Sequence, residues 1–187
     1  PYEKVAKVRM KNSRIGLGLM GMHEWLLKRN YKYEMTDELK QWMKEYERES
    51  KRSADAHCNR LFLNSPKGYR AIAPTGTISI IAGTTSGVEP IYAVAYRRRY
   101  LTDGTRWKYK FVIDGTAETL IEQGIKPDQI ESSIDLAEDV ERRIKFQFEL
   151  QKYVDHAISS TINLPAWGTE LNGEHTVDKY ASIIAKH

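Results

Sequence analysis

The sequence predicts an α/β fold in which most strands are parallel. Short apolar segments of strand-like composition alternate with longer segments of helical periodicity, an arrangement typical of this fold class. The chain has 187 residues, of which 41% are hydrophobic and 29% charged, and this is enough for one globular domain. It carries no internal repeat or low-complexity tract, so we expect residues 1–187 to form a single segment without a domain boundary.

In the N-terminal third, the sequence predicts one strand and two helices. A short buried strand is expected at 14–20, where the chain reads "RIGLGLM", and a helix at 21–30, "GMHEWLLKRN". A long helix then follows Thr36, whose hydroxyl can cap it, and "NSPKG" at 64–68 ends it. Its buried stripe is predicted to be Leu39, Met43, Tyr46, Ser50, Ala54, Cys58 and Leu61.

The rest of the chain continues the alternation of strands and helices. The predicted strands are 69–73, 91–101, 105–113 and 160–165, and the predicted helices are a short one within 74–83 and longer ones at 116–123, 137–157 and 176–187. Gly124 is expected to end the helix at 116–123, and Pro165 to stop the last strand.

Composition excludes several classes of site. The only cysteine is Cys58, so neither an intrachain disulfide nor a cysteine-based metal cluster can form, and a reducing cytoplasm is the expected compartment. The five histidines lack the spacing of metal ligands, and no metal site is predicted. No apolar run approaches the roughly 20 residues that cross a membrane. A net charge of +4 and a pI near 9.0 permit an anionic ligand without requiring nucleic acid.

Two glycine-containing turns are candidate phosphate sites. The first, "GLGLMG" at 16–21, satisfies the pattern of a dinucleotide-binding turn. That turn needs a buried strand before it and an acidic residue at the end of a second strand about 20 residues later. The preceding residues are polar and the later region is a helix start, so we interpret these glycines as sites of close backbone packing.

The second turn, "PTGTIS" at 74–79, has the layout that the first one lacks. A predicted strand delivers the chain to Pro74, and Thr75, Gly76 and Thr77 open a helix. The first turn of a helix leaves four amides unpaired at the positive end of the dipole, and hydroxyls add further donors. This pattern fits an anion cradle that needs no lysine, and it fits a well-capped helix without a ligand equally well.

Three blocks of the sequence resemble one family. They read "SRIGLGLMGMHEWLL" at 13–27, "RAIAPTGTISIIAGTTSGVEPIYAVAYRR" at 70–98 and "QKYVDHAISSTINLP" at 151–165. In this order they resemble the large, catalytic subunit of ribonucleotide reductases over roughly residues 12–167. The forms "APTGTIS" and "AISSTINLP" are more similar to the adenosylcobalamin-dependent class than to the class served by a metal-containing radical subunit.

The resemblance implies a fold, a ligand and a cofactor. The chain would be the second half, and the C-terminal portion, of a ten-stranded α/β barrel, and the complete enzyme would use adenosylcobalamin. The substrate would be a ribonucleoside di- or triphosphate. Its phosphates would be held by the residues that match the family's phosphate turn, namely Thr75, Gly76, Thr77, Ile78 and Ser79. Ile78 could act only through its backbone amide, and Glu89 in "GVEP" is assigned no chemistry.

The resemblance also implies what this chain lacks. The radical cysteine of the family lies in an Asn-Pro-Cys-x-Glu motif, which does not occur here, and Cys58 matches none of the family's catalytic cysteines. We therefore predict that Cys58 is a buried hydrophobic residue, that no catalytic residue is present and that the chain alone is inactive. Because a half-barrel leaves strand edges unpaired, we expect it to pair with the remainder of the subunit, a complementing chain or a second copy of itself.

Two further patterns have ordinary structural interpretations. Asp155, His156, Ser159 and Ser160 are residue types of a hydrolase triad, but neighbours on a helix project about 100° apart, so a surface pair is favoured. Basic and aromatic residues alternate in "YRRRYLTDGTRWKYK" at 96–110. A solvated strand pair is the favoured interpretation there, and a single-stranded nucleic-acid surface is the alternative.

Overall fold

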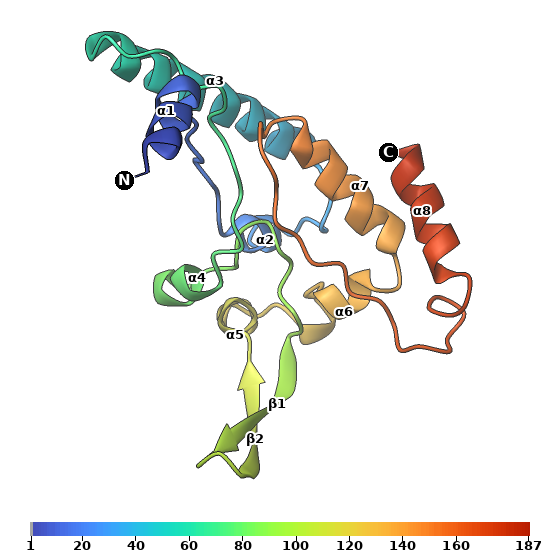
Figure 1. Ribbon diagram of the computed structural model, residues 1–187. Helices are drawn as coiled ribbons and strands as arrows, with labels where there is room; N and C mark the ends of the chain where they lie inside the picture. The colour runs from blue at the N-terminus through green and yellow to red at the C-terminus, as the bar shows by residue number, and fades with distance from the viewer. Residues whose placement is uncertain (1) are drawn as a thin grey trace.

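A computed structural model describes residues 2–187, and most of its regular structure is helical. The elements are α1 (Glu3–Asn12), α2 (Met22–Leu27), α3 (Asp37–Arg60), α4 (Gly76–Ala82), β1 (Ala95–Thr102), β2 (Arg106–Ile113), α5 (Gly115–Glu122), the 3-10 turn η1 (Pro127–Gln129), α6 (Ser133–Leu136), α7 (Val140–Gln151) and α8 (Thr176–Lys186). The long helix α3 and helix α7 run along one side of the molecule, and the β1–β2 hairpin projects from the opposite side (Figure 1).

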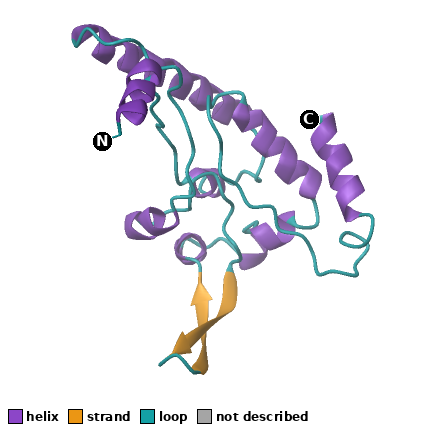
Figure 2. Cartoon of the chain, viewed as in Figure 1, coloured by secondary structure: helices purple, strands orange, loops and turns teal. Residues whose placement is uncertain are grey.

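The sheet prediction requires correction. Within residues 2–187 the regular sheet consists of β1 and β2 alone, and these strands are antiparallel (Figure 2). The strands predicted at 14–20 and 69–73 are reduced to extended segments joined by the single parallel bridge Leu17↔Arg70. The strand predicted at 160–165 does not form, and the neighbouring bridge Ile72↔Ile158 lies just before it. The predicted parallel direction therefore holds for these contacts, but each is only one bridge wide.

A side chain explains why the pairing stops. On the edge that faces the 156–159 segment, the amides of Tyr69 and Arg70 donate to the carboxylate of Asp155, at 3.1 and 3.0 Å. The Asp155 carboxylate therefore accepts hydrogen bonds from amides that would otherwise donate to the carbonyls of a neighbouring strand. Backbone pairing with this segment begins where the His156 amide donates to the Arg70 carbonyl, at 3.0 Å, and continues where the Ile72 amide donates to the Ala157 carbonyl, 3.2 Å away.

The long helices form largely where the periodicity predicts them. Thr36 caps α3 by accepting a hydrogen bond from the Leu39 amide at 3.1 Å, as predicted, and of the predicted stripe only Leu61 lies beyond the helix and is exposed. The helix predicted at 137–157 forms as α7, but its bounds are wrong, because Asp139 caps its start and the helix ends at Gln151. Helix α1 was not predicted, and it has no buried residue that a periodic pattern could report.

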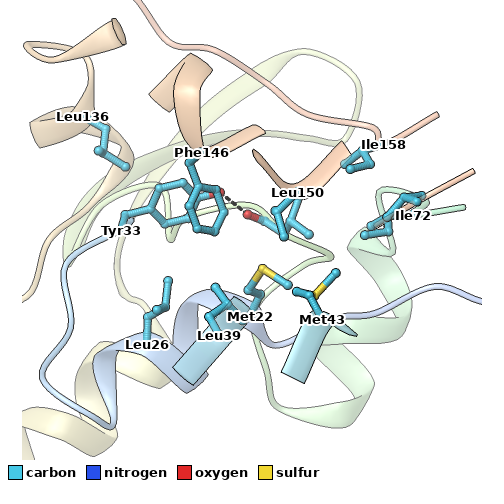
Figure 3. Packing of buried hydrophobic residues seen from close by; sticks show 12 residues of the cluster. Met22, Leu26, Tyr33, Leu39, Met43, Ile72, Leu136, Phe146, Leu150 and Ile158 are labelled. Atoms are coloured by element: carbon cyan, nitrogen blue, oxygen red, sulfur yellow. Dashed lines mark hydrogen bonds between the residues drawn. The ribbon is translucent and has the colours of Figure 1, made fainter. Parts of the chain in front are cut away.

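The main core lies where α2, α3 and α7 meet. Figure 3 shows Met22 and Leu26 from α2, packed with side chains of α3 and α7 around the ring of Tyr33. The Tyr33 hydroxyl donates to the Val88 carbonyl, which ties the loop after α4 to this core. A second, smaller cluster joins Leu27 to α5 through Leu120. The loop between α4 and β1 is thus held from two sides.

Candidate functional site

The turn before α4 is built on a left-handed residue. Thr75 has a φ of 54° and stands directly before the first helical residue, Gly76. Its hydroxyl accepts a hydrogen bond from the Gly87 amide at 2.8 Å, and its carbonyl accepts from the Ser79 amide at 2.8 Å. The Thr75 side chain therefore fastens the turn to the loop that follows α4, while its hydroxyl proton stays available to donate.

The first turn of α4 is open. Within residues 2–187, the amides of Gly76, Thr77 and Ile78 donate to no acceptor, and all three residues are exposed. A Cβ atom added to Gly76 would meet no heavy atom within 4 Å. Three consecutive amides at the positive end of a helix thus face free space, which is the arrangement that binds anions.

Ser79 differs from the other predicted site residues. Its side chain is only 1% exposed, and its hydroxyl donates to the Gly76 carbonyl at 3.1 Å and lies 2.7 Å from the Ser86 hydroxyl. The residue therefore supports the turn from beneath. Of the five predicted residues, the structure brings Thr75, Gly76, Thr77 and Ile78 to the open side and places Ser79 behind them.

A polar cleft adjoins the turn. It has a volume of about 390 Å³, and Ser79 and Ile80 form part of its wall. Pro90 and Ile91 also line it, and nine further lining residues carry a hydroxyl, carboxylate or amide group: Thr84, Thr85, Ser86, Glu89, Tyr92, Asp114, Ser133, Thr161 and Asn163. A ligand whose anionic end lay on the α4 amides could place a polar body in this cleft.

Glu89 was assigned no role from the sequence, but it anchors the cleft. Its carboxylate lies 3.1 Å from the guanidinium of Arg143 and accepts from the Thr161 amide at 2.7 Å. Arg143 is only 2% exposed and donates also to the Ser160 hydroxyl and the Thr161 carbonyl. The one sequence signal for this network is an arginine at a position where the α7 periodicity expects a buried residue.

The other glycine-containing turn is closed by the same loop. The Gly21 amide donates to the Thr85 carbonyl at 2.8 Å, and the Glu24 amide donates to the Thr85 hydroxyl at 3.3 Å. A Cβ atom on Gly18 would lie 2.9 Å from the Ala71 carbonyl oxygen. The interpretation of "GLGLMG" as a site of close packing is thereby confirmed for Gly18, and the start of α2 has protein acceptors in place of a ligand.

His23 lies buried at the start of α2. Burial, and secondarily the positive charge of Arg143, lowers the pKa of His23 to about 3. The neutral ring accepts a hydrogen bond from the Ile91 amide at Nδ1, at 2.9 Å, and packs edge-on against Tyr33 with centroids 5.3 Å apart. Its role is to hold the chain that leads into β1.

The other patterns noted in the sequence have structural roles. Asp155 and His156 lie beyond the end of α7, so the prediction of a helix-surface pair is wrong. Asp155 bonds Arg70 at 3.0 Å instead of His156. Cys58 is buried on α3, as predicted. The basic stretch forms β1 and β2, the exposed strand pair that was the favoured interpretation.

The described residues form neither a cluster of metal ligands nor a membrane-spanning helix. Among residues 2–187, no three histidine, cysteine or acidic side chains come together in a way that could hold a metal ion. Every helix in the same part of the chain is too short or too polar to span a bilayer.

The chain is similar to known proteins of one family. Residues 67–186 match the family model described as ribonucleotide reductase, barrel domain. Vitamin B12-dependent ribonucleoside-diphosphate reductases of Mycobacterium tuberculosis and Thermoplasma acidophilum are each 27% identical to this chain, over 90% and 88% of its length. A crystal structure of a B12-dependent, class II ribonucleotide reductase has a similar fold, with a TM-score of 0.61 over 96% of this chain at 18% identity.

These relatives are much longer than the chain. It spans 30% of the mycobacterial protein, 26% of the Thermoplasma protein and 34% of the crystallised one. A putative adenosylcobalamin-dependent ribonucleoside-triphosphate reductase of Mycobacterium phage D29 is 30% identical over 51% of the chain. The matches therefore concern one portion of larger proteins.

Proposed function

Because this chain belongs to the ribonucleotide reductase barrel-domain family, we propose that it forms the C-terminal part of the catalytic barrel of such an enzyme. In the complete barrel it would supply wall segments and the turn that binds the substrate phosphates. The reaction of the whole enzyme would convert ribonucleotides to deoxyribonucleotides. The predicted ten-stranded barrel, of which this chain would be the second half, is part of the same proposal.

The open first turn of α4 carries the proposal. The amides of Gly76, Thr77 and Ile78 and the hydroxyls of Thr75 and Thr77 would bind the phosphates of a ribonucleoside di- or triphosphate. Ser79 would act through the turn that it supports. The adjoining polar cleft would receive the remainder of the nucleotide.

The names of the relatives point to adenosylcobalamin as the cofactor of the complete enzyme. That cofactor serves the family's reaction by starting a thiyl radical, which needs an accessible cysteine. The residues of this chain do not fit that partnership, because its only thiol, Cys58, is buried on α3 and lies outside the polar cleft. No step of the chemistry is therefore assigned to this chain, and we propose that it is inactive alone.

The missing chemistry would come from a second polypeptide segment. Ile80 and Ile81 on α4 are 80% and 83% exposed, and Ile78 beside them is also exposed. Such neighbouring aliphatic side chains are expected where another part of a protein packs. We propose that the remainder of the catalytic subunit, or a complementing chain with the Asn-Pro-Cys-x-Glu motif, covers them.

Amide chemical shifts test the phosphate site directly. We expect a ribonucleoside diphosphate or triphosphate added to the isotope-labelled chain to shift the amide signals of Gly76, Thr77 and Ile78. The amides of Gly21 and Glu24 serve as the internal control, since protein acceptors already occupy them. The unphosphorylated nucleoside should leave all five signals in place.

The Thr77→Ala variant should weaken nucleotide binding by about fivefold, because each phosphate contact of this kind contributes on the order of 1 kcal/mol. Equal shifts at α2 and α4, or none at α4 with either nucleotide, would refute the site. Reduction of a ribonucleotide by this chain alone, with adenosylcobalamin and a dithiol supplied, would refute its role as an incomplete part.

A further inference from the structure

The hairpin of β1 and β2, residues 95–113, projects from the body with both faces in solvent (Figure 1). We call it the basic hairpin, because it carries six basic side chains and a single acidic one, Asp103. All six basic residues are exposed, and within residues 2–187 none forms an ion pair. They are Arg97, Arg98, Arg99, Arg106, Lys108 and Lys110.

The register of the strands places like charges together. Arg98 lies directly opposite Lys110. Like charges at such a position destabilise a strand pair, and an isolated two-stranded hairpin is at best marginally stable in water. An anionic surface laid on this face would relieve the repulsion, so the hairpin is electrostatically complementary to an acidic partner.

The opposite face shows what kind of anion fits. The Arg99 guanidinium lies 4.2 Å from the centre of the Trp107 ring, and that of Arg97 lies 4.5 Å from the centre of the Tyr109 ring. Each arginine occupies one face of its ring, so that face is closed to a stacked base, while Trp107 and Tyr109 are each 54% exposed. Stacked arginines keep their planar donors for carboxylates, and tryptophan, tyrosine and arginine are the residues enriched at the centres of protein interfaces.

The same chain also holds an acidic stretch. Residues 127–141, here called the acidic segment, comprise η1, α6 and the start of α7 and contain six acidic residues and no basic one. Three of the six, Asp128, Asp135 and Glu138, are exposed and have no ion-pair partner within residues 2–187. Asp135 is engaged locally by Ser132, which leaves Asp128 and Glu138 free to face a partner.

We infer that the basic hairpin of one copy docks on the acidic segment of a second copy. Within one molecule the hairpin points away from α6, so the two surfaces can meet only between molecules (Figure 1). A two-fold axis would repeat the contact, so that each copy gives its hairpin and receives the other. The two strands have 8 residues each, and with the acidic segment they approach the roughly 20–30 residues per side of a stable interface.

Sedimentation velocity of the full chain tests the docking. We expect a dimer whose dissociation constant rises by about tenfold between about 50 mM and about 500 mM NaCl, because the contact is mainly electrostatic. The hairpin variant Arg98→Glu, Lys108→Glu, Lys110→Glu should weaken the dimer by at least about tenfold. The segment variant Asp128→Lys, Glu138→Lys should do the same, and it decides the question if the hairpin variant fails to fold.

Mixing the two variants gives the sharpest result. The three glutamates of the altered hairpin then meet the two lysines of the altered segment, and the unmodified hairpin of the other copy meets an unmodified segment, so the mixture should dimerise within about threefold of the unmodified chain. A matched control for the hairpin variant, Lys4→Glu, Lys32→Glu, Lys44→Glu, makes the same change in net charge as that variant at other exposed sites and should change the dimer by less than about twofold.

Three results would overturn the inference. The first is that the chain stays monomeric at low salt. The second is that the hairpin and segment substitutions do not change the dissociation constant of the dimer. The third is that the two variants stay monomeric when mixed. Binding of oligothymidylate by a monomeric chain, lost in the hairpin variant, would assign the hairpin to nucleic acid instead. Nucleotide-dependent shifts at α4 do not depend on any of these outcomes, so the two proposals fail separately.

Discussion

Two helices of this protein begin beside the same loop, and only one of them keeps its amides free. The start of α2 gives its amides to Thr85. The start of α4 is fastened to the same loop through the Thr75 hydroxyl, yet the amides of Gly76, Thr77 and Ile78 have no partner within residues 2–187. Both helices follow glycine-containing turns, so glycine content does not separate a binding turn from a structural one. What separates them is whether another segment of the chain supplies acceptors.

The largest expected loss of stability comes from adding a side chain at the start of α2. Gly21 has a φ of 81°, and a Cβ atom there would lie 2.6 Å from the Thr84 hydroxyl oxygen. Gly21→Ala should lower the free energy of unfolding by about 3 kcal/mol, through backbone strain and displacement of Thr84. Urea unfolding measures the loss.

The matched variant at α4 is Gly76→Ala, which meets no heavy atom within 4 Å and has no positive φ. Its unfolding free energy should stay within about 1 kcal/mol of the original, because alanine is tolerated in a helix. Its nucleotide-dependent amide shifts should weaken, because the methyl group enters the open space. Equal destabilisation by the two variants would contradict the distinction between the helix starts.

The buried start of α2 should also make stability depend on pH. His23 has a pKa of about 3 when folded and an ordinary value of 6.5 when unfolded, so protonation favours the unfolded chain. Its contribution to stability is complete above pH 6.5 and is lost as the pH falls toward 3. Between pH 6.5 and 5 the chain should lose about 2 kcal/mol, at about 1.4 kcal/mol per pH unit.

A His23→Gln variant isolates this effect, since the carboxylates titrate in both proteins and cancel in the difference. Urea unfolding at the two pH values should show a smaller loss in the variant. Identical pH dependence in the two proteins would mean that the His23 ring is solvated, in conflict with its burial and with its bond from the Ile91 amide.

The smallest effect separates the two hydroxyls of the α4 turn. Ser79→Ala should cost about 1 kcal/mol of unfolding free energy, because the buried Ser79 hydroxyl donates to Gly76 and leaves Ser86 unpaired when removed. Thr77→Ala removes an exposed hydroxyl and should change stability by less than about 0.5 kcal/mol. Thermal unfolding compares the pair, and a larger loss from Thr77→Ala would place that hydroxyl inside the protein.

Local pattern predicted the elements whose causes are local. Helix α3 was predicted from its apolar period and from Thr36, and both lie within the helix or next to it. The C-terminal end of α7 could not be predicted, because it depends on a residue far away in sequence. Arg70 donates a hydrogen bond to the Tyr153 carbonyl, just beyond the helix end, at 2.8 Å. The short pairing between 69–73 and 156–159 has a similar cause, since the Asp155 carboxylate accepts from the Tyr69 and Arg70 amides.

The candidate site also has features that follow from local sequence and features that depend on distant segments. By itself the sequence determined that a helix begins after Thr75, that its first amides lack partners within the helix and that hydroxyls surround them. Only the tertiary structure decided that the loop after α4 closes the start of α2 and leaves that of α4 open, and that Glu89 joins Arg143 beside it. An amide can be paired by any carbonyl in the chain, so its availability depends on which distant segments fold against it.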